Sequence, residues 1–340
     1  MSTDPDGVLP RVSIVVPVYN REHYLAAALD SVRAQTLRAW ELVVHDDGSS
    51  DGSVAVAERY AAADSRISVS GGPNGGVASA RNNGFAATDR RTEFVIFLDS
   101  DDMWEPDALD ALVAALDAHP EFSSAQSIAR CIDAEGEPLP DDDLEERARR
   151  RMGYRAGRLV PVGLDEPTTF AEMVVHNWVM TPGTHLVRRR VMEQVGPFDV
   201  ATDPADDWDM AIRISRFGDI GFVNRSLLLW RRHGNTLTNT SPRWRQAYFT
   251  VRQQMLSHPA NTPEQTRLAR LSFQGANRAA LEEAWGSLTN GRFKEAVRGA
   301  AKALQQYALY LRADVPTRLR HSLRTPGGVA TRPAAGVSGS

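Results

Sequence analysis

The chain has 340 residues, and its hydrophobic fraction of 42% and charged fraction of 24% are typical of a globular protein. Its formal net charge of −4 argues against a protein whose whole surface binds nucleic acid, so we expect no nucleic-acid partner. The single cysteine, Cys131, excludes an intramolecular disulfide and an all-cysteine metal site, and it predicts a reducing, cytoplasmic setting. No apolar run approaches the ~18 residues of a membrane span. Residues 1–10 are polar and lack the apolar run of a signal peptide, so we expect a flexible N-terminus there.

The first hundred residues alternate between strand-like and helix-like segments. Strands are predicted at four short apolar runs, which are residues 12–16, 42–44, 67–69 and 94–98. Pro17 is expected to end the first strand, because proline cannot donate a hydrogen bond to a sheet ladder. Helical spacing between the runs implies right-handed βαβ units and hence an α/β fold, with a mainly parallel sheet flanked by helices. Ligands of such sheets bind at the carboxyl ends of the strands.

The pattern after residue 105 is more mixed. Strands are predicted at residues 127–132, 184–187, 220–223 and 227–230, and helices are predicted to start at Pro106 and at Asp203-Pro204. The highly charged segment 140–158 is expected to be an exposed loop or helix. Residues 239–325 are expected to be helical, with a hairpin that breaks near Asn290-Gly291, and the tail at 326–340 is expected to be disordered.

An acidic cluster follows the strand predicted at 94–98. In Asp99-Ser100-Asp101, an extended backbone points both carboxylates the same way. Two ionised carboxylates repel each other, and a hard divalent cation such as Mg²⁺ or Mn²⁺ relieves that cost. The alternative is a solvated turn in which Asp102 caps the next helix.

Asp47 lies in a second acidic run, residues 46–49, after the second predicted strand. An acid there can accept hydrogen bonds from a ribose or a base edge, and the alternative is an Asx turn with Gly48 at positive φ. The glycine-rich run 75–84 opens a helix, where backbone can approach a ligand and Arg81 offers a planar fork for a phosphate or a base. The alternative for Arg81 is a surface ion pair.

A third acidic run, Asp206-Asp207-Trp208-Asp209, begins a predicted helix. Acids in a first turn ordinarily complement the helix dipole, whereas a buried carboxylate there can serve as a general base. His233 follows the last predicted strand and two arginines. A lone histidine is more often a plain surface or core residue, but near a metal it can complete the coordination.

Taken in chain order, these segments resemble the family 2 glycosyltransferases, which have the GT-A fold. The resemblance rests on seven pieces, which are residues 12–20, 46–51, 76–82, 97–102, 196–199, 206–209 and 231–233. Each piece alone is weak, but the seven occur in family order over residues 11–238. The family usually has Glu-Asp where this chain has Asp206-Asp207, so the second acid is retained.

The resemblance implies an inverting, metal-dependent enzyme that moves a sugar from a nucleotide diphosphate sugar, first of all a UDP-sugar, to an acceptor hydroxyl. It implies a nucleotide-binding half at 11–105 and an acceptor-binding half at 106–238, followed by the helical C-terminal extension. Eight residues are implied to bind the nucleotide: Pro17, Val18, Tyr19, Asp47, Arg81, Asp99, Ser100 and Asp101. Asp101, Asp99 and His233 would hold the divalent metal, Mn²⁺ or Mg²⁺. Asp207 would be the catalytic base, with Asp206 and Asp209 as weaker candidates.

Two other functions stay open. A nucleotidyltransferase also uses an acid-bound metal, but it needs a basic, glycine-rich loop after the first strand, where this chain has the sequence Pro-Val-Tyr-Asn at 17–20. A catalytically silent nucleotide-sugar-binding module would keep the fold and the acids without turnover.

The C-terminal helices carry a charge pattern of their own. Residues 292–324 hold eight basic side chains against two acidic ones, with Tyr307 and Tyr310 nearby. This pattern is compatible with a peripheral contact to an anionic membrane, at its inner face. The alternative is the solvated face of a packing or homodimerising helix.

Overall fold

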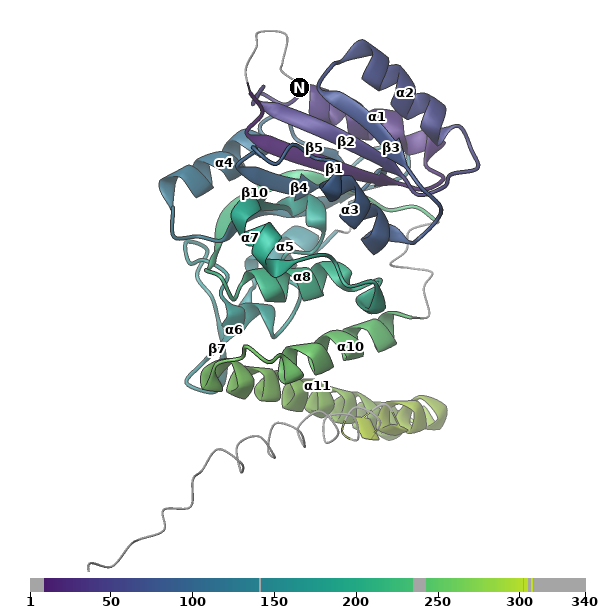
Figure 1. The fold of residues 1–340 in the computed structure, drawn as a ribbon. Helices are drawn as coiled ribbons and strands as arrows, with labels where there is room; N and C mark the ends of the chain where they lie inside the picture. Colours follow the sequence, from purple (N-terminus) through teal and green to yellow (C-terminus); the bar gives the residue numbers. More distant parts are fainter. Residues whose placement is uncertain (1–8, 141, 235–242, 302, 305–306, 308–340) are drawn as a thin grey trace, which may run out of the picture. The chain divides into compact units, whose positions relative to one another are not determined.

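The computed structural model describes residues 9–140, 142–234, 243–301, 303–304 and 307 (Figure 1). The chain forms two compact units, Met1–Met255 with Thr262–Ser272, and Leu256–Asn261 with Phe273–Ser340. The predictions for residues 1–8 and for the tail at 326–340 lie outside the described residues. Over the ranges that the structure describes, no helix combines the length and the apolar character needed to cross a membrane.

The first unit is built on an eight-stranded sheet of order β3-β2-β1-β4-β9-β6-β10-β5. Its strands are β1 (Val12–Val18), β2 (Trp40–Asp46), β3 (Ile67–Gly71), β4 (Phe94–Phe97), β5 (Met103–Trp104), β6 (Ser124–Ile132), β9 (His185–Arg188) and β10 (Ile220–Arg231). Neighbours among β3, β2, β1 and β4 pair in parallel, as do β6 and β10, whereas β9 and β5 run antiparallel to their neighbours. The mixed, mainly parallel sheet predicted from the sequence is therefore confirmed. A separate hairpin pairs β7 (Met152–Arg155) with β8 (Arg158–Pro161).

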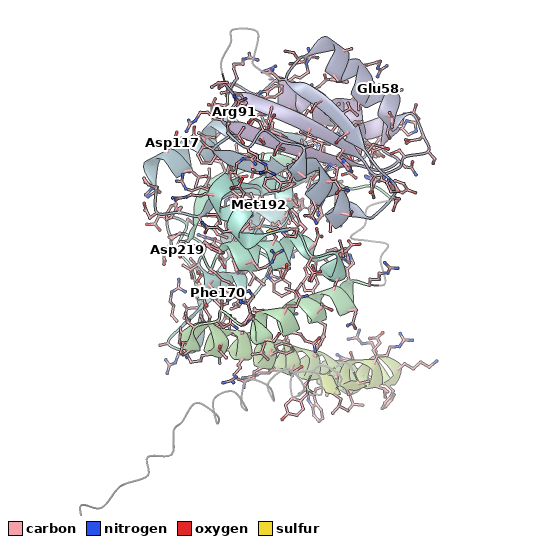
Figure 2. All side chains as sticks on the ribbon, in the orientation of Figure 1. Glu58, Arg91, Asp117, Phe170, Met192 and Asp219 are labelled. Carbon is pink, nitrogen blue, oxygen red and sulfur yellow. The ribbon has the colours of Figure 1, made fainter. Side chains whose placement is uncertain are left out.

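Helices cover both faces of this sheet. The helices that pack on the sheet are α1 (Glu22–Arg33), α2 (Ser53–Ala63), α3 (Val77–Ala86), α4 (Ala108–Ala118), α7 (Arg189–Val195) and α8 (Asp206–Ile214). The structure also describes α5 (Leu144–Arg149), α6 (Phe170–Met173), α10 (Trp244–Ser257) and α11 (Pro263–Thr289). Ile14 and Val16 of β1 pack in a cluster with α1, α2 and α4, whereas Val15 faces a second cluster with α3, α7 and α8. Met192 of α7 lies inside this second cluster, while Glu58 of α2 lies at the surface (Figure 2).

The second unit contains the later part of α11 and a further helical segment that begins at residue 293. A turn at Asn290-Gly291 separates the two, where the sequence predicts the break. The two segments pack closely, because a Cβ atom built on Gly299 would lie 2.9 Å from the Cβ atom of Ala284.

The prediction that Pro17 ends the first strand is wrong. β1 continues through Pro17 to Val18 and pairs with β2 over its whole length. On its other side, β4 pairs only as far as Val15. The backbone N–H and C=O groups of residues two apart along a strand point to the same edge of that strand. The carbonyl of Val15 accepts a hydrogen bond from the N–H of Leu98, so the backbone of Pro17 also points to the edge where β4 lies, beyond the last β4 pair. The missing N–H therefore removes no ladder hydrogen bond, as is usual where proline occurs in strands.

Three further local predictions are wrong. The helix predicted from Asp203-Pro204 begins only at Asp206, as α8, and a cis peptide bond joins Asp203 to Pro204. The two strands predicted at 220–223 and 227–230 form one strand, β10, with shifts in its register. The segment 140–158 is not simply exposed, because Arg151 is fully buried and donates hydrogen bonds to the carbonyls of Gly163 and Glu166. Its guanidinium also stacks on the ring of Phe222 at 3.7 Å, so packing overrides the charge pattern.

The contact between α3 and the sheet depends on a glycine. A Cβ atom on Gly84 would lie 2.5 Å from Val15 Cγ1 and 3.3 Å from His45 Cβ, so the Gly84→Ala variant must push α3 away from β1 and β2. We expect the free energy of unfolding to fall by about 1–3 kcal/mol, measured by urea titration. Gly72→Ala is the matched control, because a Cβ atom there meets nothing within 4 Å. Equal stability of the two variants would contradict this packing.

Candidate active site

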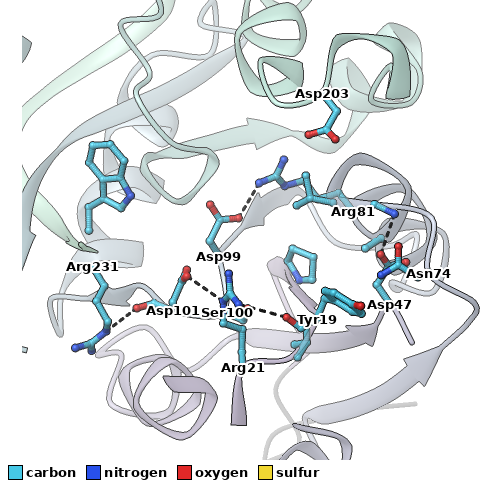
Figure 3. Close-up of a pocket in the computed structure, with 16 residues that line it drawn as sticks. Tyr19, Arg21, Asp47, Asn74, Arg81, Asp99, Ser100, Asp101, Asp203 and Arg231 are labelled. Atoms are coloured by element: carbon cyan, nitrogen blue, oxygen red, sulfur yellow. Dashed lines mark hydrogen bonds and ion pairs between the residues drawn. The ribbon is translucent and has the colours of Figure 1, made fainter. Parts of the chain in front are cut away.

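The carboxyl ends of β1, β2 and β4 lie at one edge of the sheet, and a cavity of about 280 Å³, which we call the first cavity, opens there (Figure 3). All eight residues predicted to bind nucleotide line it: Pro17, Val18, Tyr19, Asp47, Arg81, Asp99, Ser100 and Asp101. Most of them lie at the carboxyl end of a strand or just after it. Because these strands are parallel, their carboxyl ends meet at one edge of the sheet and bring the residues together. The ring of Tyr19 is half exposed.

Asp47 fixes the glycine-rich loop that forms one wall of this cavity. Its carboxylate accepts hydrogen bonds from the backbone N–H groups of Gly75 and Gly76, both at 2.9 Å. The Asx turn considered as an alternative for this run exists, but Asp46 makes it, accepting from the N–H groups of Gly48 and Ser49. The loop after β3 is thereby held at the end of β2.

Arg81 is buried and bridges two acids. One guanidinium nitrogen lies 2.7 Å from Asp99 Oδ1 and the other lies 2.6 Å from Asp206 Oδ2 (Figure 3 shows the bond to Asp99). The surface ion pair considered for Arg81 is therefore replaced by a buried one. Burial still raises the pKa of Asp99, despite the adjacent guanidinium.

Asp101 has two basic neighbours. Its Oδ2 accepts a hydrogen bond from Arg21 Nε at 3.1 Å and lies 3.0 Å from His233 Nε2. Burial opposes ionisation of Asp101, but His233 and Arg21 together hold its pKa below the ordinary value. His233 itself does not line the first cavity, and its ring stacks on Tyr24 at 4.7 Å.

Asp102 does not cap the next helix. It is almost fully buried, and its Oδ1 accepts a hydrogen bond from the N–H of Arg231 in β10. Burial raises its pKa well above the ordinary value. Asp102 therefore ties the loop after β4 to the neighbouring part of the sheet.

The separation of one pair of donor atoms, on Asp101 and His233, fits a divalent cation. In the part of the chain that the structure describes, no three His, Cys, Asp or Glu side chains come together as a complete metal site. However, adjacent ligands of an octahedral ion with bonds of ~2.1 Å lie about 3.0 Å apart. Asp101 Oδ2 and His233 Nε2 have that separation. A carboxylate and an imidazole are suitable donors, with water and substrate oxygens to complete the shell.

A second cavity, of about 390 Å³, adjoins the first. The two share four lining residues, which are Val77, Arg81, Asp99 and Trp230. Asp207 lines the second cavity and not the first, so the structure places it beside the other predicted site residues rather than among them. Three aromatic side chains line this second cavity: Trp230, Trp244 and Tyr248.

The surroundings of Asp207 make its carboxylate a stronger base than that of an ordinary aspartate. Its Oδ1 accepts a hydrogen bond from the N–H of Trp208 at 2.7 Å, and its Oδ2 accepts one from Asn177 Nδ2 at 3.0 Å. Burial and the charge of Asp206 raise the pKa of Asp207 to about 7.

The two weaker candidates for the base, Asp206 and Asp209, each form an ion pair with an arginine. Asp206 is buried against Arg81 at 2.6 Å, and Asp209 is buried against Arg213 at 2.8 Å. Both carboxylates are therefore neutralised within the fold, whereas Asp207 forms no ion pair of that kind with any residue that the structure describes.

Several site residues were missed from the sequence. Arg21 directly follows the segment 17–20, and its place just beyond a strand end was a usable signal. Asn177 lies in the segment between α6 and β9, which has no motif and no periodicity, so no signal could have found it. Asp203, Trp230 and Arg231 reach the first cavity only through tertiary contacts.

Known proteins resemble this chain in sequence. A family model described as glycosyl transferase family 2 matches residues 13–195. The putative glycosyltransferase EpsH of Bacillus subtilis (strain 168) is 42% identical over 104 residues, which are 31% of this chain and 30% of EpsH. The chain spans less than a third of the length of the first curated relatives that it matches.

Solved structures resemble it in fold. S. aureus TarS 1–349 in complex with UDP-GlcNAc superimposes with a TM-score of 0.62 at 18% identity, over 90% of this chain and 83% of that one. The mannosyltransferase PcManGT from Pyrobaculum calidifontis, in complex with GDP-Man and Mn²⁺, superimposes with a TM-score of 0.56 at 18% identity, over 92% and 89% of the two chains. At this identity the likeness shows a shared GT-A fold.

Proposed function

Because the chain belongs to glycosyl transferase family 2, we propose that it transfers a sugar from a nucleotide diphosphate sugar to an acceptor hydroxyl, with inversion at the anomeric carbon. The observation that carries the proposal is the pair of adjoining cavities that meet at Arg81 and Asp99, with Asp101 in the first and Asp207 in the second. A donor and an acceptor placed in the two cavities would meet at that junction.

The first cavity is the proposed donor site. Pro17, Val18 and Tyr19 would hold the nucleobase beside Asp47, and Asp99 and Ser100 would contact the ribose. The complexes of TarS with UDP-GlcNAc and of PcManGT with GDP-Man support a nucleotide sugar as donor, and UDP is the nucleotide that we propose to test first.

Asp101, Asp99 and His233 would hold Mn²⁺ or Mg²⁺, which suits the 3.0 Å separation of Asp101 Oδ2 and His233 Nε2. The ion would neutralise the negative charge that grows on the departing diphosphate. Arg21 now occupies the same carboxylate oxygen of Asp101, so its side chain would turn aside when the site is filled.

The second cavity is the proposed acceptor site. Asp207 accepts the proton of the acceptor hydroxyl while that oxygen attacks the anomeric carbon from the face opposite the nucleotide. The bond between the acceptor oxygen and the anomeric carbon forms as the bond between that carbon and the diphosphate oxygen breaks. The nucleoside diphosphate leaves with the electron pair of the broken bond. Asn177 and the N–H of Trp208 fix the orientation of the carboxylate, and a pKa of about 7 lets it act near neutral pH.

Replacing the base separates binding from turnover. We expect Asp207→Asn to lower kcat by about 10²–10⁴-fold while UDP binding is retained, measured by nucleotide release and by calorimetry. The base must be ionised, so the wild-type kcat/KM should fall as pH drops below about 7, and the residual rate of the variant should not. Asp165→Asn, at an exposed site, is the charge-matched control. Near-normal turnover in Asp207→Asn would remove Asp207 from this role, and a wild-type protein that binds nucleotide sugars without turnover would be a silent module.

Binding of the metal by Asp101 can be tested without measuring turnover. A ligand that binds only the folded protein raises its melting temperature. We expect UDP with Mn²⁺ to raise the Tm of the wild type by more than UDP alone does. The Asp101→Ala variant should lose most of that extra rise because it removes the carboxylate between Arg21 and His233. Asp165→Ala should keep it. An unchanged Mn²⁺ effect in Asp101→Ala would count against the assignment.

A further inference from the structure

The helical hairpin of the second unit, residues 273–301 and 303–304, has small residues on its inside. Ala280 and Ala284 of α11 are buried, as are Ala296 and Ala303 of the following segment. Gly299 packs so tightly against Ala284 that an added Cβ atom would clash. Alanine and glycine let two helices approach closely, but they bury little apolar area.

Phe273, at the start of the hairpin, is buried, but seven other large apolar side chains of this region are exposed. They are Leu281, Trp285 and Leu288 on α11, and Phe293, Val297, Leu304 and Tyr307 beyond the turn. Trp285 is 68% exposed and Phe293 is 66% exposed. At about 100° per residue, the first set falls within about 60° of arc, and Phe293 and Val297 lie about 40° apart. Each helical segment therefore exposes large apolar side chains on a narrow face, and we call the seven side chains together the hairpin stripe. Exposed apolar side chains gathered in this way mark an interaction site.

Beside the stripe on α11, Arg278 pairs with Glu282 at 2.8 Å, so the two charges balance there, whereas basic residues predominate beside the second helical segment. In the second helical segment, Lys294 and Arg298 lie about 100–140° from Phe293, and Arg292 directly precedes the segment. Glu295, which pairs with Arg292 at 3.0 Å, lies about 200° away. The run 292–324 holds eight basic residues against two acidic ones. Two copies joined through this face would bring like charges together, whereas a negatively charged partner would complement them.

We propose that the hairpin stripe docks on an anionic lipid surface and lies on the bilayer without crossing it. Tryptophan is favoured at the boundary between headgroups and acyl chains, and Trp285 lies on this face. An apolar face with basic flanks is the form of an interfacial helix, and nearby basic residues are attracted to anionic lipids. The proposal does not depend on the transferase activity.

The test is co-sedimentation of the full chain with vesicles. The probes are vesicles of phosphatidylglycerol mixed with phosphatidylcholine, and vesicles of phosphatidylcholine alone. We expect the wild type to bind the anionic vesicles more strongly and to be released by salt. Trp285→Ser with Phe293→Ser should weaken that binding by about tenfold or more, because two aromatic side chains no longer enter the bilayer. Lys294→Glu with Arg298→Glu should remove the preference for anionic lipid.

Phe217→Ser is the matched control, because Phe217 is an exposed aromatic residue of the first unit. It should bind as the wild type does, and circular dichroism should show every variant folded. Failure of the wild type to bind anionic vesicles would overturn the proposal, as would equal binding by the Trp285→Ser, Phe293→Ser variant. A dimer in sedimentation velocity that this double variant dissociates would overturn it too, because the stripe would then belong to a second copy of the chain.

Discussion

A buried arginine between two aspartates is the interaction on which the site depends. Arg81 contacts Asp99 and Asp206, and the side chains of Arg81 and Asp206 are almost fully removed from water. Burying the charges of Arg81 and Asp206 is costly, and close pairing in a region of low dielectric constant offsets that cost. The pairing fixes helix α3, the loop after β4 and the start of α8 to one another, although Arg81 and Asp206 are 125 residues apart in the chain. Losing one member would leave an unpaired charge inside the protein.

The two cavities hold acids with different proton affinities. His233 and Arg21 keep the pKa of Asp101 low, so Asp101 stays ionised. Burial and the neighbouring charge of Asp206 raise the pKa of Asp207 to about 7. Carboxyl groups whose environments push their pKa values apart can take different chemical roles. In the proposed reaction, the first holds positive charge near the diphosphate and the second accepts a proton.

The sequence predicts well what depends on neighbouring residues. The order of strands and helices and the parallel sheet follow from runs and spacings within about ten positions, because the ends of parallel strands meet at one edge. The eight residues expected to bind nucleotide come from the resemblance to a known family, and all eight line the first cavity. The sequence predicts poorly what depends on partners distant in the chain. Pro17 could stay in a strand only because β4 ends opposite Val15, and Arg151 could be buried only because Gly163 and Glu166 accept its hydrogen bonds. The link from Asn177 to Asp207 has no local signal at all.

The most direct measurement of the central claim is a double-mutant cycle on Arg81 and Asp206, with the free energy of unfolding measured for the wild type, Arg81→Met, Asp206→Asn and the double variant. If the buried bridge holds the two sides of the site together, the double variant should lose less stability than the sum of the single losses, by about 2 kcal/mol or more. Losses that add to within about 0.5 kcal/mol would show that the two residues do not act as a pair, and would contradict the account.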